Sequence, residues 1–413
     1  MGAAAFPATV ALLQPLLPSP NPGYQRLPLA RGLAQPIAIY LHVAIDCRRG
    51  HDLQTIPLKG ETMPMTYRDR VIAAIEQRPI DRIPTDMWAT PEIAAQLQQH
   101  FGCGSLLQVW DYMDVDGIAS IGPDYVGPKL PDLGPDRKVD EWGMTYRWQQ
   151  YECGSYWEQV GYPLAEAETI ADIDAFPWPR PQWYDYSVMK DKAKEAGERA
   201  IMYGYTAIFY FHNKLRGLEL SLMDLALWPD FARHLIRRIA DTFLELHEPG
   251  FQAGRGVIDL TQVTDDFGSQ HGLLISRDMI NAFYRPWMER AIKQAKSYGL
   301  KVFHHDDGGI REIIPDLLEM GIDILNPIQW RCPGMEQAGL ARDFGGRVCF
   351  HGGVDNQQTL PFGSREDVQA EVAYNLSTLG SRGTGYILAP CHNIQPNTPI
   401  ENIIAMYEAA HRS

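Results

Sequence analysis

The chain has 413 residues, of which 45% are hydrophobic and 21% are charged, a composition typical of a folded globular protein. Its 37 Lys and Arg residues against 51 Asp and Glu residues give a formal net charge of −14, which disfavours nucleic acid as a partner. No run of about 18 uncharged apolar residues is present, so the sequence predicts no membrane span. The six cysteines are widely spaced and form no CxxC pair. We therefore expect a cytoplasmic enzyme that acts on a small-molecule substrate.

Residues 1–62 differ from the rest of the chain. Nine prolines fall within the first 64 positions, acidic residues are scarce, and neither helical nor strand periodicity is sustained. We expect an N-terminal extension that is disordered or, if Met63 or Met65 is the true start, not translated. A regulatory tail is the alternative. The folded domain is predicted to cover residues 63–413.

The predicted elements begin with a helix behind Thr66, followed by a short strand at Pro84–Trp88. Residues 105–185 are rich in Trp, Tyr, Pro and Gly and predict an irregular insertion over one end of the fold. Beyond residue 200, β-branched runs alternate with periodic helical segments, which predicts a parallel sheet with helical crossovers. The strands are expected in ERAIMYGYT, GVIDLTQV, LKVFHH, GIDILNPIQ, RVCFHGG and GYILAP, and the helices over 276–298, 310–320, 364–379 and 400–411. This count indicates a single (β/α)8 TIM barrel, an α/β fold.

Chemically active residues follow the predicted strands, where barrel enzymes place their active sites. His305 and Asp307 alternate at the end of one strand, so both can face the same ion, and a Cys391 thiolate from the last strand can complete the set. These three residues are the predicted metal ligands, and zinc accepts all three donor types. The alternative is that such side chains only hydrogen-bond the loop backbone.

Further strand-end residues are candidates for catalysis or binding. Asp265, beside Asp266, can act as a general acid or base or cap the next helix, for which Ser276 is equally available. The predicted catalytic residues are Asp307, Asp265 and His351, and the predicted substrate-binding residues are Tyr205, His212, Asn326, Gln329 and Asp355. The aromatic and polar residues among them can equally be packing at the barrel rim.

Four ordered blocks resemble the uroporphyrinogen decarboxylase superfamily, and more narrowly its cobamide-dependent methyltransferase branch. The blocks are YRDRVIAAIEQRPIDRIPTDMW, HHDDGGIREIIPDLLEMGIDILNPIQ, FHGGVDNQQTLPFGSREDVQAEV and ILAPCHNIQPNTPIENIIAMYEAA. The resemblance covers roughly residues 65–413 and implies a (β/α)8 barrel with the site in its mouth. In that branch a His-x-Cys pair and a second Cys bind zinc, which activates a thiol acceptor. Here the pair reads His305-x-Asp307, and the harder oxygen ligand departs from that pattern.

The resemblance implies transfer of a methyl group between a corrinoid and a small thiol or tetrahydrofolate-type acceptor. The sequence has no Asp-x-His-x-x-Gly run of the kind that holds cobalt, so the corrinoid is expected as a substrate or on a small partner protein. A homodimer is also expected. The alternative activity is that of uroporphyrinogen decarboxylase, a lyase. Members with that activity carry an Arg-containing loop after the first strand, whereas this chain has no Arg between Arg82 and Arg137.

Overall fold

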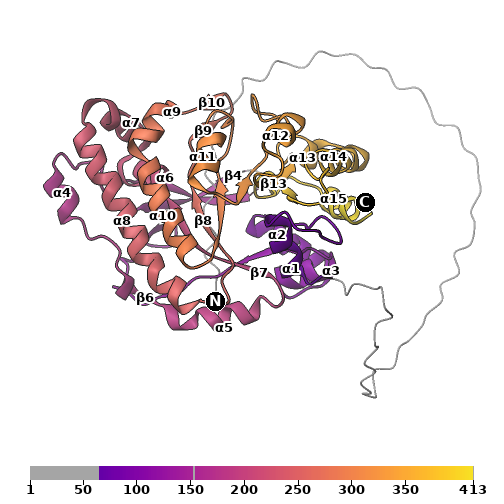
Figure 1. Cartoon of the computed structure of the whole chain (residues 1–413). Coiled ribbons are helices and arrows are strands. Elements are labelled where there is room, and N and C mark those ends of the chain that lie inside the picture. Colours follow the sequence, from indigo (N-terminus) through magenta and orange to yellow (C-terminus); the bar gives the residue numbers. More distant parts are fainter. Residues whose placement is uncertain (1–64, 152–153, 413) are drawn as a thin grey trace, which may run out of the picture. The chain divides into compact units, whose positions relative to one another are not determined.

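The computed structural model describes residues 65–151 and 154–412, so the predicted extension at 1–62 lies outside the described residues. Its main sheet has seven parallel strands in the order β1-β7-β8-β11-β12-β13-β14 (Figure 1). The strands are β1 (Ile118–Ser120), β7 (Ala200–Ala207), β8 (Leu260–Thr264), β11 (Lys301–His305), β12 (Ile324–Asn326), β13 (Cys349–Val354) and β14 (Tyr386–Pro390). Each of the six strands predicted beyond residue 200 is confirmed.

An extended segment at residues 84–90 lies between the first and last of these strands. It forms parallel bridges to the β14 side at Thr85–Leu388 and Ala89–Ile394. On its other side the Gly117 amide, just before β1, donates to the Thr85 carbonyl oxygen at 2.9 Å. The segment therefore takes the place of the eighth strand and closes the sheet, which confirms the predicted TIM barrel and the strand at Pro84–Trp88.

Apolar side chains fill the interior of the barrel. One buried cluster contains Leu260, Phe303, Ile324, Cys349 and Ile387, contributed by five successive strands. A second, larger cluster includes residues of the strands and of the surrounding helices. Both faces of these strands are buried, so every residue of β8, β13 and β14 is buried, including polar side chains such as Gln262 and His351.

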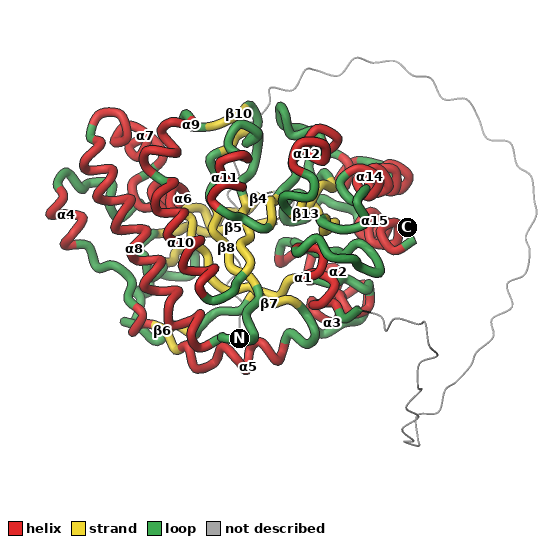
Figure 2. Tube along the Cα trace, in the orientation of Figure 1, coloured by secondary structure: helices red, strands yellow, loops and turns green. Residues whose placement is uncertain are grey.

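Helices cover the outside of the sheet, with α6, α8 and α10 on one side in Figure 2 and α12, α14 and α15 on the other. The helices are α1 (Tyr67–Ile75), α2 (Pro91–Phe101), α3 (Leu106–Tyr112), α4 (Ile170–Ala175), α5 (Met189–Glu195), α6 (Ile208–Arg216), α7 (Leu218–Leu227), α8 (Pro229–Ala253), α9 (Arg277–Phe283), α10 (Arg285–Ser297), α11 (Ile314–Met320), α12 (Gln337–Phe344), α13 (Thr359–Phe362), α14 (Arg365–Thr378) and α15 (Ile400–His411). Thr66 caps α1 and Ser276 caps α9, each through a side chain that accepts from a backbone amide. No helix in the described part of the chain is long and apolar enough to cross a membrane.

The predicted insertion at 105–185 is more regular than expected, and part of it belongs to the barrel. It contains β1, an antiparallel pair of β2 (Asp124–Tyr125) with β6 (Tyr184–Asp185), and an antiparallel sheet of β3 (Arg137–Val139), β4 (Thr145–Tyr151) and β5 (Gly154–Gly161). Arg216 of α6 fastens the insertion, because its Nη1 donates to the carbonyl oxygens of Leu164, Ala165 and Ala167. A buried Asp224 carboxylate pairs with the same guanidinium at 2.7 Å.

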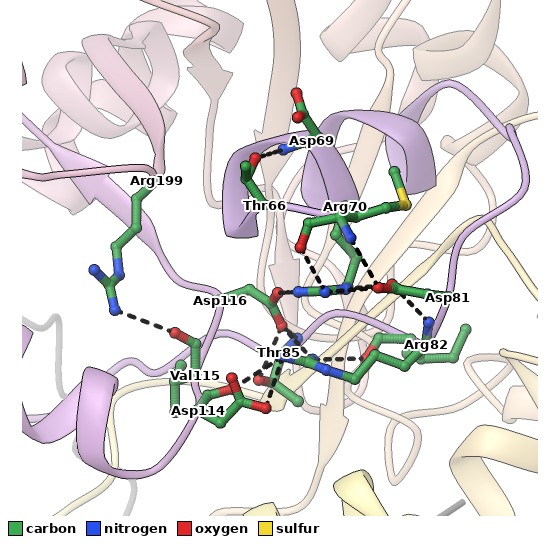
Figure 3. A network of polar contacts seen from close by, with 12 residues as sticks. Thr66, Asp69, Arg70, Asp81, Arg82, Thr85, Asp114, Val115, Asp116 and Arg199 are labelled. Atoms are coloured by element: carbon green, nitrogen blue, oxygen red, sulfur yellow. Dashed lines mark hydrogen bonds and ion pairs between the residues drawn. The ribbon is translucent and has the colours of Figure 1, made fainter. Parts of the chain in front are cut away.

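A network of charged residues joins the start of the first barrel segment to the start of β1 (Figure 3). Asp116 is fully buried and accepts from Arg70 Nη1 at 2.5 Å, Arg82 Nη1 at 2.6 Å and the Thr85 amide at 2.9 Å. Asp81 binds Arg70 as well. Arg70 and Arg82 are thus engaged at the amino end of the barrel, away from the strand ends where the candidate site lies.

Candidate active site

Three side chains converge at the carboxyl ends of β11 and β14. His305 is the last residue of β11, Asp307 follows two residues later, and His392 follows the end of β14. One ligand atom from each lies within 4.8 Å of the other two, and Asp307 carboxylate oxygens are 3.8 Å from His305 Nε2 and 3.9 Å from His392 Nε2. Two imidazoles and a carboxylate form a donor set that suits zinc and other first-row metal ions.

A chain of hydrogen bonds runs from His305 into the protein. His305 Nδ1 lies 2.6 Å from Asn326 Oδ1, Asn326 Nδ2 lies 2.8 Å from His351 Nδ1, and His351 Nε2 lies 3.0 Å from Asp86 Oδ2. Asn326, His351 and Asp86 are all buried. Since the Asp86 carboxylate only accepts, His351 must donate through Nε2 and accept at Nδ1. We call these four residues the relay.

The relay sets which nitrogen of His305 carries the proton. His351 Nδ1 accepts from the Asn326 amide nitrogen, so Asn326 presents its oxygen to His305, and His305 donates through Nδ1. In neutral His305, Nε2 therefore carries a lone pair directed toward Asp307 and Asp266. Burial lowers the pKa of His305, but the carboxylates of Asp307 and Asp266 and the bond to Asn326 outweigh it and raise the pKa overall.

Asp266 and Trp88 complete the immediate surroundings of this group. Asp266 Oδ1 is 3.8 Å from His305 Nε2, and this buried oxygen has no hydrogen-bond partner among the described residues. Burial raises the pKa of Asp266 to about 6, although the His305 charge opposes the increase. The Trp88 ring lies 5.6 Å from His305 and 6.4 Å from His392 between ring centroids. An indole wall and a carboxylate oxygen without a partner in the described residues therefore flank the three donors.

The structure places Asp265 beneath the start of α6. Its Oδ1 accepts from the Tyr210 amide at 2.9 Å, and the Phe209 amide also donates to the carboxylate. Burial nevertheless raises the pKa of Asp265, and Asp306 and Asp266 add to the increase. Asp265 therefore caps a helix, the structural alternative considered for it, although the helix is α6 and not the following one. Ser276 caps that next helix.

Four other predicted residues lie in structural positions. The Cys391 thiol is buried and donates to the Ile328 carbonyl oxygen at 3.2 Å, and Cys391 is not part of the three-donor group. Burial raises the pKa of this thiol. Asp355 pairs with Arg331 at 2.6 Å and accepts from three backbone amides. His212 is fully buried against the Tyr284 hydroxyl, and Gln329 accepts from the Gly308 amide, so these residues hold loops and core in place.

The chain is similar to known proteins both in sequence and in fold. The model of the uroporphyrinogen decarboxylase (URO-D) family matches residues 188–413, more than half of the chain. The chain belongs to the URO-D family.

The sequence relatives and a structurally similar protein carry two different names. A uroporphyrinogen decarboxylase of Anaeromyxobacter sp. (strain Fw109-5) is 28% identical over 253 residues, which are 59% of this chain and 68% of the relative. One from Anaeromyxobacter dehalogenans (strain 2CP-C) is 23% identical over 84% of this chain and 99% of the relative. A solved methyltransferase from Methanosarcina mazei has a TM-score of 0.61 and 17% identity, covering 84% of this chain and 98% of that chain. That likeness shows the shared fold.

Sequence reasoning missed four members of this URO-D site: His392, Asp266, Asp86 and Trp88. His392 and Asp266 are the direct neighbours of Cys391 and Asp265, which were chosen instead. The observation that strand-end side chains alternate in direction could have placed both neighbours on the short list. Asp86 and Trp88 stand in the first barrel segment, and only its pairing beside β14 brings them to the site.

Proposed function

We propose that this URO-D enzyme transfers a methyl group from a methylcobamide to a small thiol or tetrahydrofolate-type acceptor, with zinc held by His305, Asp307 and His392. The observation that carries the proposal is the three-donor group in which the relay directs the His305 Nε2 lone pair toward Asp307. This set differs from the predicted one, because His392 replaces Cys391.

The residues fit a metal ion in both chemistry and spacing. Ligands about 2.1 Å from a tetrahedral ion are separated by roughly 3.4 Å. The separations of 3.8 and 3.9 Å to Asp307 are only a few tenths of an ångström longer, and small side-chain rotations can close such a difference. The buried Asp266 oxygen without a partner adds a second negative group beside the ion. Zinc at this position would lower the pKa of a coordinating thiol and supply a thiolate at neutral pH.

The protein residues then orient the acceptor and manage its proton. In the transfer, the methyl carbon forms a bond to the acceptor sulfur or nitrogen while the carbon–cobalt bond breaks and its electron pair stays on cobalt. The acceptor proton passes to Asp266, whose Oδ1 lies beside His305 and has no competing donor in the described residues. Trp88 supplies an apolar wall next to the three donors, and the relay keeps His305 fixed during the reaction.

The corrinoid is proposed to arrive as a free substrate or on a small partner protein, since the sequence has no cobalt-holding run of its own. A second candidate function is decarboxylation of uroporphyrinogen, which the names of the sequence relatives favour. Against it, the carboxylates of Asp266 and Asp307 lie beside His305, and Arg82, which precedes the first barrel segment, pairs with Asp116. A substrate with many carboxylates would meet negative charge there.

The test is anaerobic incubation of the full chain with methylcobalamin and a panel of thiol and tetrahydrofolate acceptors. Formation of cob(I)alamin, followed by its absorption spectrum, is the expected result, together with about one zinc per chain. His305→Gln and Asp307→Asn should lose both. His234→Gln is the matched control, because His234 of the outer helix α8 pairs with Asp174 of α4 and not with the three-donor group. Release of carbon dioxide from uroporphyrinogen, with no demethylation by any acceptor, would replace this proposal with the decarboxylase.

A further inference from the structure

Two lysines lie against one tyrosine ring where the insertion sheet meets α6. Lys138 Nζ of β3 is 5.5 Å from the centroid of the Tyr146 ring, and Lys214 Nζ of α6 is 5.1 Å from it. Lys138 Nζ also lies 4.5 Å from the Trp157 ring centroid, and Lys214 Nζ lies 5.5 Å from that of Tyr210. Aromatic faces thus hold both ammonium groups, an attraction weaker than a buried ion pair.

Neither ammonium group has a carboxylate within 4.0 Å among the described residues, whereas Lys192, Lys296 and Lys301 each have one. Asp140 is the acidic residue whose charge acts on both lysines. Its carboxylate, however, already accepts from two backbone amides and from the Tyr146 hydroxyl. Burial lowers the pKa of Lys214 to about 8, because its charge is desolvated without a close counterion.

The pair is connected to the candidate active site through two tyrosines. Lys214 contacts Tyr210, whose backbone amide binds Asp265. Tyr205 is near both Tyr210 and the carboxylates of the candidate site, since the charges of Tyr210, Asp266, Asp265 and Asp307 all act on it.

We propose that Lys138 and Lys214, set against Tyr146, bind a carboxylate or phosphate group of the substrate. The identity of that substrate as the methyl acceptor rests on the proposed function. Two ammonium groups with one Asp140 nearby carry a net positive charge of one, which complements a single oxyanion. An acceptor with an anionic end would thus be held at a fixed distance from its reacting thiol or amine.

Calorimetric titration of the full chain with glutarate and with inorganic phosphate, without any corrinoid, tests the site and distinguishes the two anions. We expect one anion to bind per chain and Lys138→Gln or Lys214→Gln to weaken it about tenfold. Lys214→Arg should retain binding, because the charge is kept. Lys293→Gln is the matched control, since Lys293 is exposed near the end of α10 and has no ion pair in the described residues. If both Gln variants bound the anion as tightly as the native chain, or if the native chain bound neither anion, the proposed site would be wrong.

A kinetic comparison separates this inference from the proposed function. 3-Mercaptopropionate and 3-mercapto-1-propanol differ only in the anionic group, and Lys214→Gln should raise KM for the first about tenfold while leaving the second unchanged. Anion binding that depends on the lysines, with no methyl transfer to any acceptor, would reject the proposed function and retain the site. Methyl transfer with equal KM values for 3-mercaptopropionate in the native chain and the variant would retain the proposed function and reject the lysine site.

Discussion

Replacing Asp86 with Asn should reverse the proton arrangement of His305, although the two residues are separated by His351 and Asn326. Asp86 Oδ1 accepts from the Met87 and Ile118 amides, so the new side-chain oxygen is expected to stay there. The new amide nitrogen then faces His351 Nε2 and donates to it. His351 must donate through Nδ1, which turns the Asn326 amide over and places the proton of His305 on Nε2.

The size of the effect follows from these buried bonds. To present a lone pair at His305 Nε2 again, the variant must leave one buried polar group of the relay unpaired, at a cost of about 1–3 kcal/mol. This corresponds to about a tenfold to 100-fold loss of metal affinity, in the range expected for partners that orient a metal-binding histidine. Asp86 Oδ2 also accepts from Trp88 Nε1, so the variant should lose some stability as well.

The assay is zinc competition against a chromophoric chelator, with nitrogen NMR of the histidine side chains to read the tautomer of His305. Asp116→Asn is the matched control, because Asp116 is an equally buried aspartate that binds Arg70 and Arg82 instead of the relay. It should destabilise the fold and leave zinc affinity unchanged. An Asp86→Asn protein with the native tautomer, or with zinc affinity within about twofold of the native value, would refute the reasoning.

The remaining predictions concern the ligands, the loop and acid stability. His392→Ala should remove most of the bound zinc while Cys391→Ser retains it, measured as metal per chain; the opposite result would restore Cys391 as the ligand. Gly268→Ala should weaken zinc binding, because its Cβ would collide with the Asp307 backbone oxygen, and unchanged affinity would contradict this. Burial lowers the pKa of His247 to about 4, below its ordinary 6.5, so the unfolded chain binds the extra proton and stability falls as the pH drops from about 6.5 to 4. Relative to His247→Gln, the native free energy of unfolding should decline about 1.4 kcal/mol more per pH unit in this range, measured by urea denaturation; parallel curves would exclude His247.

The barrel could be predicted because short β-branched or apolar runs such as Tyr386–Pro390 alternate along the chain with periodic helical segments. β1 could not be separated from the insertion, since Ile118–Ser120 is only three residues long and follows Asp114 and Asp116. The helix expected over 276–298 is two helices, because Tyr284 ends the first and Pro286 starts the second.

At the site, the sequence predicted the strand ends and the kinds of side chain, and the alternation of His305 and Asp307 brought both to one ion-sized group. Alternation continues for two residues past β11 but not past β8 or β14. Beyond Pro390 and Thr264 the chain turns, so neighbouring positions exchange roles and Cys391 and Asp265 face the interior while His392 and Asp266 approach the donors. The relay joins residues of four separate barrel segments, β11, β12, β13 and residues 84–90, and such long-range contacts cannot be read from the local sequence.

The first barrel segment is bound to the last strand, and this pairing sets when the site can exist during synthesis of the protein. Residues 84–90 leave the ribosome early, but their partners Leu388 and Ile394 are made about 300 residues later. At about 5–20 residues per second, the segment and these partners remain apart for tens of seconds. A nascent chain that has not yet closed its barrel therefore lacks the Asp86 anchor of His351, and the orientation of His305 waits for barrel closure.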